Sequence, residues 1–363
     1  MKKSHLRDGI RGFIRLLNRL KINIKKQLGF MLNPEETAQY NEQRIGLNNT
    51  FFKNTADWGL QYALLVMLRK IYRRFGKEEL VLGRYHEFIE DFLRTCGNEI
   101  ILNYQNTEQE KKMNPIPKDS IIWICWWQGE EQAPQLVKAC IESVRENSKD
   151  HMVQIVTEKN FESFADIPQV IIDKWRKGLI GHANFADILR CALLCEHGGI
   201  WLDATMYMCR SFPDELYRRC FCSFRRAEAG QAVKYVACGR WGSYYLAAGE
   251  KNPLMMFARD MQFIYWIKND KAIDYGLIDY CIDLACREIP LCREAMNAFP
   301  ADNPDMHHLY PVINDAYSAE LYEKMCKHTY LFKLSYKKTF LISVGGMDTF
   351  YKKLIMEQGN QHA

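Results

Sequence analysis

Residues 184–205 read NFADILRCALLCEHGGIWLDAT. The first part of this stretch, residues 184–197, has the pattern of a helix, and Gly198 and Gly199 end it with a tight turn. A short apolar run follows and ends at Asp203. A helix, a glycine turn and a short buried strand in this order are typical of a parallel sheet covered by helices.

The flanking sequence repeats this alternation. Residues 121–127 form a short apolar run rich in β-branched and aromatic residues, and residues 153–157 form another. Between them, Pro134 opens a helical segment that runs to about residue 147. Because strands and helices alternate, we expect an α/β fold with a mostly parallel sheet. The length of 363 residues allows one large domain with an appendage, or two domains.

The first 30 residues differ from the rest of the chain in charge. They hold nine Lys and Arg residues against the single acid Asp8, so their net charge is +8 in a chain that totals +5. Apolar residues recur at helical spacing beside the basic ones, as in a helix that lies on an anionic membrane surface. A helix packed on the protein's own body is the alternative explanation.

Composition limits the class of protein. Hydrophobic residues make up 48% and charged residues 26% of the chain, which is the usual mixture of a globular protein. The longest apolar runs, residues 58–68 and 121–127, are shorter than the roughly 20 residues of a membrane-spanning helix. The 13 Cys include no CxxC pair and no apolar leader is recognised, so we expect a reducing, cytoplasmic environment. Since basic charge is confined to one end, we expect no nucleic-acid partner.

Three charged residues of residues 184–205 are candidates for one cleft. Asp187 and Arg190 lie one helical turn apart, and Asp203 ends the following strand. Ligands of open α/β sheets bind beyond the carboxyl ends of the strands, where a carboxylate can hold a cation or a sugar hydroxyl and an arginine can bind phosphate. Helix capping by Asn184 and a surface ion pair between Asp187 and Arg190 explain the same residues without a ligand.

At this point the sequence resembles a known family. The run from Asp187 to Asp203 is similar to the signature ADxxRxxxLxxxGGxxxDxD of glycosyltransferases with a DxD motif. Residues 116–129 (IPKDSIIWICWWQG) resemble the first strand of the related capsular polysaccharide synthesis proteins, and residues 134–143 resemble their first helix. The resemblance is strong over residues 115–215 and weak beyond them.

The resemblance implies a GT-A-like glycosyltransferase fold, in which a Rossmann-like nucleotide-binding half joins an acceptor-binding half. It implies a nucleotide-sugar donor, usually with Mn²⁺ or Mg²⁺. Asp187 and Arg190 would contact the donor sugar, and Asp203 would contact the metal and the ribose or sugar. Thr205 takes the place of the second DxD carboxylate, as related capsular proteins also show, and a hydroxyl is a poor ligand for a hard dication. Metal dependence is therefore an open question.

Aromatic residues of the first strand are the candidates for stacking on the nucleotide base. Trp126 aligns best with the family, and Trp123 and Trp127 are further candidates, although packing in a buried strand explains all three.

Other candidates lie nearer the carboxyl terminus. Asp279 is a candidate carboxylate on the acceptor side, or a helix-surface acid. The pair His307–His308 is a candidate for a metal or phosphate contact, or is structural. Lys333, Lys337 and Lys338 are basic enough to contact phosphate or a membrane, and a solvated basic face explains them equally well.

We expect three regions. The residue pattern predicts a basic membrane-surface helix over residues 1–30 and a helical region over residues 31–112, and the resemblance implies a GT-A-like domain over residues 113–350. The expected function is transfer of a sugar, with retention, from a nucleotide sugar, preferably a UDP-sugar, to a lipid-linked or polysaccharide acceptor of a capsule. The protein would act at the inner face of the cell membrane. Two alternatives stay open: a catalytically silent scaffold of a polysaccharide assembly complex, and a sugar-phosphate transferase that uses the same cleft.

Overall fold

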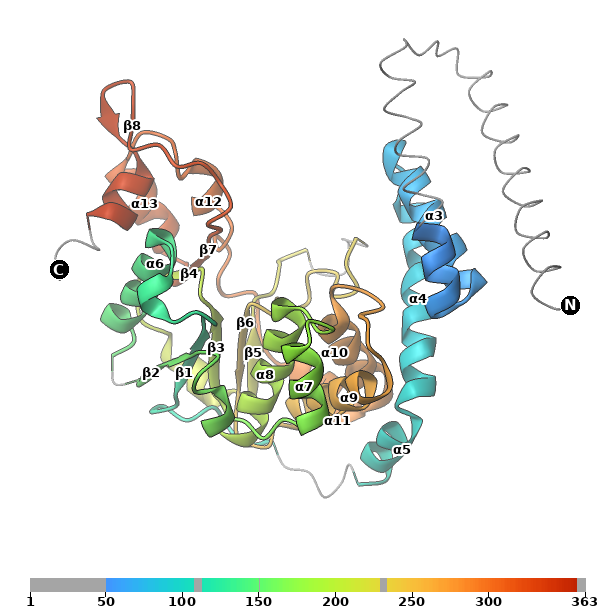
Figure 1. Ribbon diagram of the computed structural model, residues 1–363. Coiled ribbons are helices and arrows are strands. Elements are labelled where there is room, and N and C mark those ends of the chain that lie inside the picture. The colour runs from blue at the N-terminus through green and yellow to red at the C-terminus, as the bar shows by residue number, and fades with distance from the viewer. Residues whose placement is uncertain (1–49, 108–112, 150, 229–233, 358–363) are drawn as a thin grey trace, which may run out of the picture. The chain divides into compact units, whose positions relative to one another are not determined.

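The computed structural model describes residues 50–107, 113–149, 151–228 and 234–357 (Figure 1). The expected membrane-surface helix of residues 1–30 lies outside these ranges. The chain divides into two compact units, residues 1–71 and residues 72–363. In the described part of the first unit, Phe51 and Ala63 form a small buried apolar cluster.

The helices and strands alternate along most of the chain. The helices are α3 (Leu60–Arg74), α4 (Glu79–Cys96), α5 (Asn98–Asn106), α6 (Gln135–Asn147), α7 (Gln169–Arg176), α8 (His182–Glu196), α9 (Pro253–Lys268), α10 (Leu277–Glu288), α11 (Pro290–Asn297), α12 (Leu309–Val312) and α13 (Ala319–Cys326), with short helices η2 (Glu130–Gln132), η3 (Phe161–Ser163), η4 (Asp214–Arg218) and η5 (Lys352–Met356). The strands are β1 (Ile122–Cys125), β2 (Val153–Val156), β3 (Gly199–Asp203), β4 (Met206–Met208), β5 (Phe221–Ser223), β6 (Tyr245–Ala248), β7 (Leu331–Lys333), β8 (Ser343–Val344) and β9 (Met347–Asp348).

A five-stranded sheet forms the centre of the second unit (Figure 1). Its strand order is β2-β1-β3-β6-β5. Strand β1 pairs in parallel with β2 and β3, whereas β6 runs antiparallel to both β3 and β5. Four of the five strands therefore run in one direction, which confirms the α/β class and the mostly parallel sheet. This arrangement is consistent with the GT-A-like fold that the resemblance implies.

The stretch 184–205 folds as the pattern indicates, with one difference. Helix α8 begins at His182, so Asn184 is inside the helix and the prediction that it caps the helix is wrong. Its side-chain amide instead donates to the backbone oxygen of Tyr275 at 3.2 Å. Helix α8 is buried along most of its length because it contacts the central sheet on one side and α9 on the other.

The glycine turn after α8 requires both glycines. Gly198 and Gly199 have φ angles of +66° and +101°, a region that side chains other than glycine rarely adopt. A Cβ atom on Gly199 would also lie 2.4 Å from the backbone oxygen of Ile121, which is closer than packing allows. The turn can therefore bring β3 directly beside β1 without strain.

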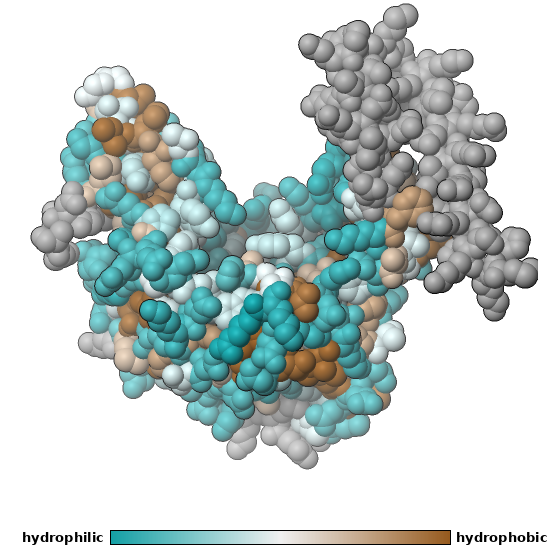
Figure 2. All heavy atoms as spheres, in the orientation of Figure 1, coloured by the Kyte–Doolittle hydropathy of each residue, from teal (hydrophilic) through white to brown (hydrophobic). Residues whose placement is uncertain are grey.

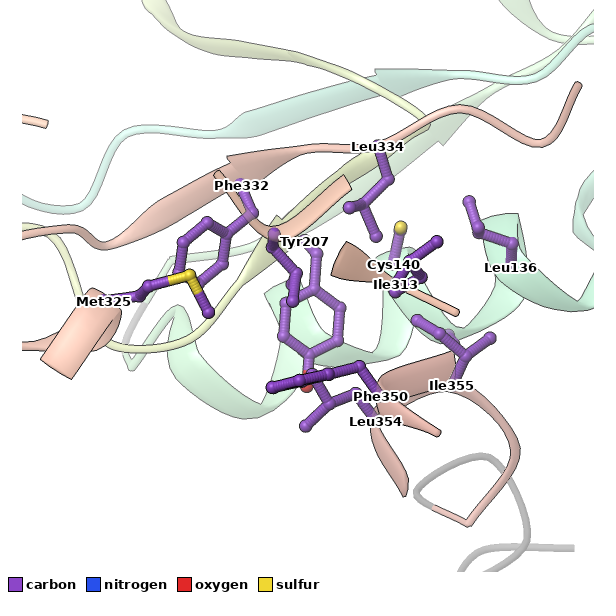
Figure 3. Packing of buried hydrophobic residues seen from close by; sticks show 12 residues of the cluster. Leu136, Cys140, Tyr207, Ile313, Met325, Phe332, Leu334, Phe350, Leu354 and Ile355 are labelled. Carbon is purple, nitrogen blue, oxygen red and sulfur yellow. The ribbon is translucent and has the colours of Figure 1, made fainter. Parts of the chain in front are cut away.

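A second, two-stranded sheet stands beside the first. Strand β4 follows β3 after two residues and pairs antiparallel with β7, with Met206 opposite Lys333 and Tyr207 opposite Phe332. Figure 3 shows Tyr207, Phe332 and Leu334 packed into one buried cluster with side chains of α6 and of the C-terminal segment. Alternate residues of a strand point to opposite faces, so Lys333 points away from this cluster.

Two segments outside the sheet have little regular structure or end in short helix. Between β2 and α7 the short helix η3 forms. Helix α5 ends at Asn106. None of the helices in the described ranges is long and apolar enough to cross a membrane.

Candidate functional site

The candidate site lies at the carboxyl edge of β1 and β3. Cys125, the last residue of β1, is aligned with Asp203, the last residue of β3. The chain after β1 begins with Trp126, and the chain after β3 leads to Thr205. The parallel pairing therefore brings two segments, about 80 residues apart in sequence, to one edge of the sheet, where ligands of such sheets bind.

Arg190 joins the two predicted carboxylates. Its Nη2 atom lies 3.0 Å from Oδ1 of Asp187 and 3.4 Å from Oδ1 of Asp203. The guanidinium also donates to the backbone oxygen of Ser243 and stacks over the ring of Trp201, 4.8 Å from its centroid. The structure thus brings together Asp187, Arg190 and Asp203, and buries the arginine between them.

A lysine from a distant strand completes the group. Lys333 Nζ donates to Oγ1 of Thr205 at 2.6 Å and to Oδ2 of Asp203 at 3.2 Å. Its position follows from the β4–β7 pairing, because Lys333 is opposite Met206, the residue after Thr205. The sequence marked Lys333 as a possible phosphate contact, but no signal in the sequence indicated this partnership across 128 residues.

The two oxygens of the Asp203 carboxylate face different partners. Oδ1 accepts from Nε1 of Trp201 at 3.2 Å and faces Arg190, whereas Oδ2 faces Lys333. Burial alone would raise the pKa of Asp203, but the charges of Lys333 and Arg190 outweigh it and the pKa lies below its usual value. Asp203 is therefore an anion at neutral pH.

The pKa values of two further carboxylates, Asp187 and Asp279, are shifted upward instead. Burial raises the pKa of Asp187 to about 7, although Arg190 opposes this, and the nearby charges of Asp279 and Asp203 add to the rise. Burial likewise raises the pKa of Asp279 to about 6, against the opposing effects of a hydrogen bond from Trp241 and the charge of Arg190. Carboxylates with such divergent pKa values in one place are typical of functional sites.

Asp279 joins the site from another part of the chain. It lies in the first turn of α10, and its Oδ1 accepts from Nε1 of Trp241 at 2.8 Å. Its side chain is half-buried, and its charge adds to the raised pKa of Asp187. Asp279 is therefore not a fully solvated acid on a helix surface.

The three tryptophans have different surroundings. Trp123 is almost completely buried and donates to the backbone oxygen of Gly198 at 3.0 Å. Trp127 is also buried, donates to the backbone oxygen of His182 at 3.2 Å, and packs among other aromatic rings. Packing therefore explains both, and neither ring is open to a base in this structure.

Trp126 is the remaining candidate for a base contact. It is half-buried, and its ring meets that of Tyr336 edge to face with centroids 5.6 Å apart. Within the described residues its indole Nε1 is buried without a hydrogen-bond partner. Because a buried N–H without an acceptor is costly, a bound ligand that accepts from it would gain affinity.

His307 and His308 have different surroundings. His307 Nε2 lies 2.9 Å from the hydroxyl of Tyr244, and the Tyr244 ring lies 5.5 Å from Lys333 Nζ. Burial, together with nearby cations including Lys333, lowers the pKa of His307, so its imidazole is neutral at pH 7. His308 is exposed and pairs with Asp305 at 2.6 Å. Only His307 is therefore near the site.

The residues expected to bind a metal do not form a fitting site. Thr205 Oγ1 and Asp203 Oδ2 both contact the Lys333 ammonium, and Asp203 Oδ1 faces Arg190. A dication 2.0–2.6 Å from Oδ2, the distance that Mg²⁺ and similar ions prefer, would meet the ammonium that already lies 3.2 Å from that oxygen. Across the described ranges, no cluster of three or more His, Cys, Asp or Glu residues could hold a metal ion. The expected metal position is thus next to a protein cation.

A comparison with protein families shows the family of this chain. The family model of capsular polysaccharide synthesis proteins matches residues 69–354. The chain therefore belongs to the capsular polysaccharide synthesis protein family. A comparison with curated proteins gives no match. Among solved structures the chain is similar to the PaToxG glycosyltransferase, with a TM-score of 0.37 and 15% identity over 68% of this chain and 99% of that chain.

Proposed function

We propose that this protein is a glycosyltransferase of capsule synthesis, which transfers a sugar from a nucleotide-sugar donor, preferably a UDP-sugar. The observation that carries the proposal is the group Asp187–Arg190–Asp203 at the carboxyl edge of β3, in a chain of the capsular polysaccharide synthesis family. This edge is where nucleotides bind in α/β folds of this kind.

The proposed roles follow from charge and position. Asp203, which stays ionised, accepts hydrogen bonds from hydroxyl groups of the ribose or of the donor sugar. Arg190 holds Asp187 and Asp203 in one fixed geometry, because its guanidinium contacts both. Trp126 contacts the base through its ring or its unpaired N–H. Preorganised groups of this kind lower the barrier mainly by stabilising charge that develops on the leaving diphosphate.

The acceptor side is proposed to involve Asp279 and Asp187. Both carboxyl groups have a raised pKa, so near neutral pH each exchanges a proton more readily than an ordinary aspartate. An acceptor hydroxyl placed between them would have a proton acceptor at hand. Transfer with retention is part of the proposal because the family resemblance implies it.

A lipid-linked acceptor at the inner face of the membrane is part of the same proposal. Residues 1–30 carry a net charge of +8, which favours an anionic lipid surface. In the second unit, the β8–β9 hairpin exposes the apolar side chains of Ile342, Val344 and Met347, and Figure 2 shows apolar surface on this lobe. Sedimentation with vesicles containing anionic lipid, compared between the full chain and a chain without residues 1–30, tests the contact. Equal binding of both chains would contradict a role for residues 1–30.

Release of a nucleoside diphosphate tests the proposed activity. The purified full chain is incubated with UDP-, GDP- and CDP-sugars, with and without a membrane extract as acceptor source. We expect release from one class of donor, and a loss of at least 100-fold in Asp203→Asn. The matched control is Asp119→Asn, since Asp119 is exposed and precedes β1.

The products separate the proposed function from its alternatives. A product that keeps a phosphate on the transferred sugar would indicate a sugar-phosphate transferase. Binding of capsular glycan by a folded protein that consumes no donor would indicate a scaffold. Either result would replace the proposal.

A further inference from the structure

The position of Lys333 shows what takes the place of the second DxD carboxylate. In this chain the second position is Thr205, whose side chain accepts a hydrogen bond from the Lys333 ammonium. The same ammonium lies 3.2 Å from the Asp203 carboxylate. The two residues that would hold a cation from solution therefore hold a cation that belongs to the protein.

The lysine is available to a ligand. An ammonium has three N–H donors, and its hydrogen bonds within the described residues use two of them, with Asp203 and Thr205. The side chain of Lys333 is 23% exposed and that of Asp203 is 28% exposed, so solvent reaches the pair. One N–H of Lys333 can thus donate to an anion that enters from the carboxyl edge of β3.

The strand that carries Lys333 is fixed in position. Leu334 donates from its backbone N–H to the Thr205 oxygen at 2.9 Å, and Lys333 donates from its backbone N–H to the Met306 oxygen at 2.8 Å. Phe332 and Leu334 anchor the strand in the cluster of Figure 3. An ammonium held in this way needs little reorganisation when charge develops near it, which is what electrostatic catalysis requires.

We propose that Lys333 binds the diphosphate of the nucleotide-sugar donor in place of a divalent metal ion, so that donor binding and transfer need no metal. The proposal rests on the proposed function, since it concerns the same donor. In the transfer step, the bond between the sugar's anomeric carbon and the diphosphate oxygen breaks and its electron pair stays on the diphosphate. The acceptor oxygen bonds to the sugar and gives up its proton to one of the two acceptor-side carboxylates, Asp279 or Asp187. The ammonium of Lys333 faces the negative charge that appears on the leaving diphosphate.

Calorimetric titration of the full chain tests the proposal. The probes are UDP, GDP and CDP, each in EDTA and each with Mn²⁺ or Mg²⁺. We expect one diphosphate to bind in EDTA with an affinity within about threefold of that in Mn²⁺. Lys333→Gln, which keeps an N–H donor on a side chain one bond shorter but has no charge, should weaken the diphosphate at least tenfold. Lys333→Arg should retain most of the affinity.

Two controls separate phosphate binding from a structural role. The corresponding nucleoside, which has no phosphate, should bind Lys333→Gln as it binds the natural chain. Lys324→Gln should change neither affinity, because Lys324 is exposed on α13. Equal loss of nucleoside and diphosphate in Lys333→Gln would mean that the lysine only maintains the fold, and would overturn the proposal.

The comparison with and without metal needs no variant. Binding of the diphosphate only with Mn²⁺ or Mg²⁺ would overturn the role of Lys333 and leave the glycosyltransferase proposal intact. If no nucleotide binds the folded chain in either condition, the proposed function fails, and the role of Lys333 fails with it.

Discussion

Replacing Arg190 with methionine should destabilise the protein in a way that depends on pH. The side chain of Arg190 is 8% exposed and contacts Asp187 and Asp203. Removing one partner of a buried ion pair typically costs about 3–5 kcal/mol, because the remaining charge is left without compensation. Asp203 keeps Lys333 as a partner, so the part of this cost that depends on charge comes mainly from Asp187 and appears where Asp187 would be ionised.

The pKa of Asp187 sets the pH window. Its pKa is about 7 in the folded protein and near 3.9 in an unfolded chain, so the folded state binds the proton more tightly. The stability of the natural protein should therefore fall as pH rises from about 4 to 7, and Asp187 adds no further change above 7. Without Arg190 the pKa of Asp187 rises further, and the fall continues above pH 7.

The extra cost of the Arg190→Met variant can be estimated from this shift. If Asp187 stays protonated in the folded variant across this range, the stability of the variant falls by about 1.4 kcal/mol more than that of the natural protein between pH 6 and pH 8. Urea unfolding of both proteins at pH 6 and pH 8, followed by tryptophan fluorescence, measures the difference.

The Asp187→Asn variant tests whether Asp187 causes this pH dependence. In Asp187→Asn the same arginine substitution should cost the same free energy at pH 6 and pH 8. The reasoning is refuted if Arg190→Met costs less than about 1 kcal/mol at both pH values, or if its cost does not grow with pH in the chain that keeps Asp187.

Three further predictions concern other parts of the site. Trp126→Ala should weaken nucleotide binding by about tenfold, in line with the roughly 1–3 kcal/mol of base stacking, as measured by calorimetry. Trp127→Ala should instead lower the free energy of unfolding by about 3–5 kcal/mol, as measured by urea unfolding. The reverse pattern would contradict these roles. Asp279→Asn should raise the melting temperature more at pH 8 than at pH 5, because the raised pKa shows that the fold disfavours the ionised form, and an equal effect at both pH values would count against its burial. Phe332→Ala should cost about 3–5 kcal/mol and also reduce donor binding, since it loosens the strand that carries Lys333; unchanged donor binding in the folded variant would argue against that coupling.

The sheet and part of the site could be predicted from short-range pattern. Runs of apolar residues near positions 122 and 200, each next to a glycine or a helical segment, are local signals, and the strands form there. The spacing of Asp187, Arg190 and Asp203 is also local, because a helix and a glycine turn fix how far apart they lie. Helix boundaries are less certain from sequence: α8 starts two residues before Asn184, after Gly181, and no side-chain cap marks its start.

The sequence by itself determined the α/β class, the carboxyl edge of the sheet and the three charged residues that meet there. Only the tertiary structure decided which tryptophans are buried by packing, and that Lys333 contacts Asp203 and Thr205. The reason is physical: these contacts join residues far apart in the chain, and the pairing of β4 with β7 depends on burial of Phe332 and its neighbours. Local pattern carries no information on such pairings, so the cation beside Asp203 became visible only when the strands were in place.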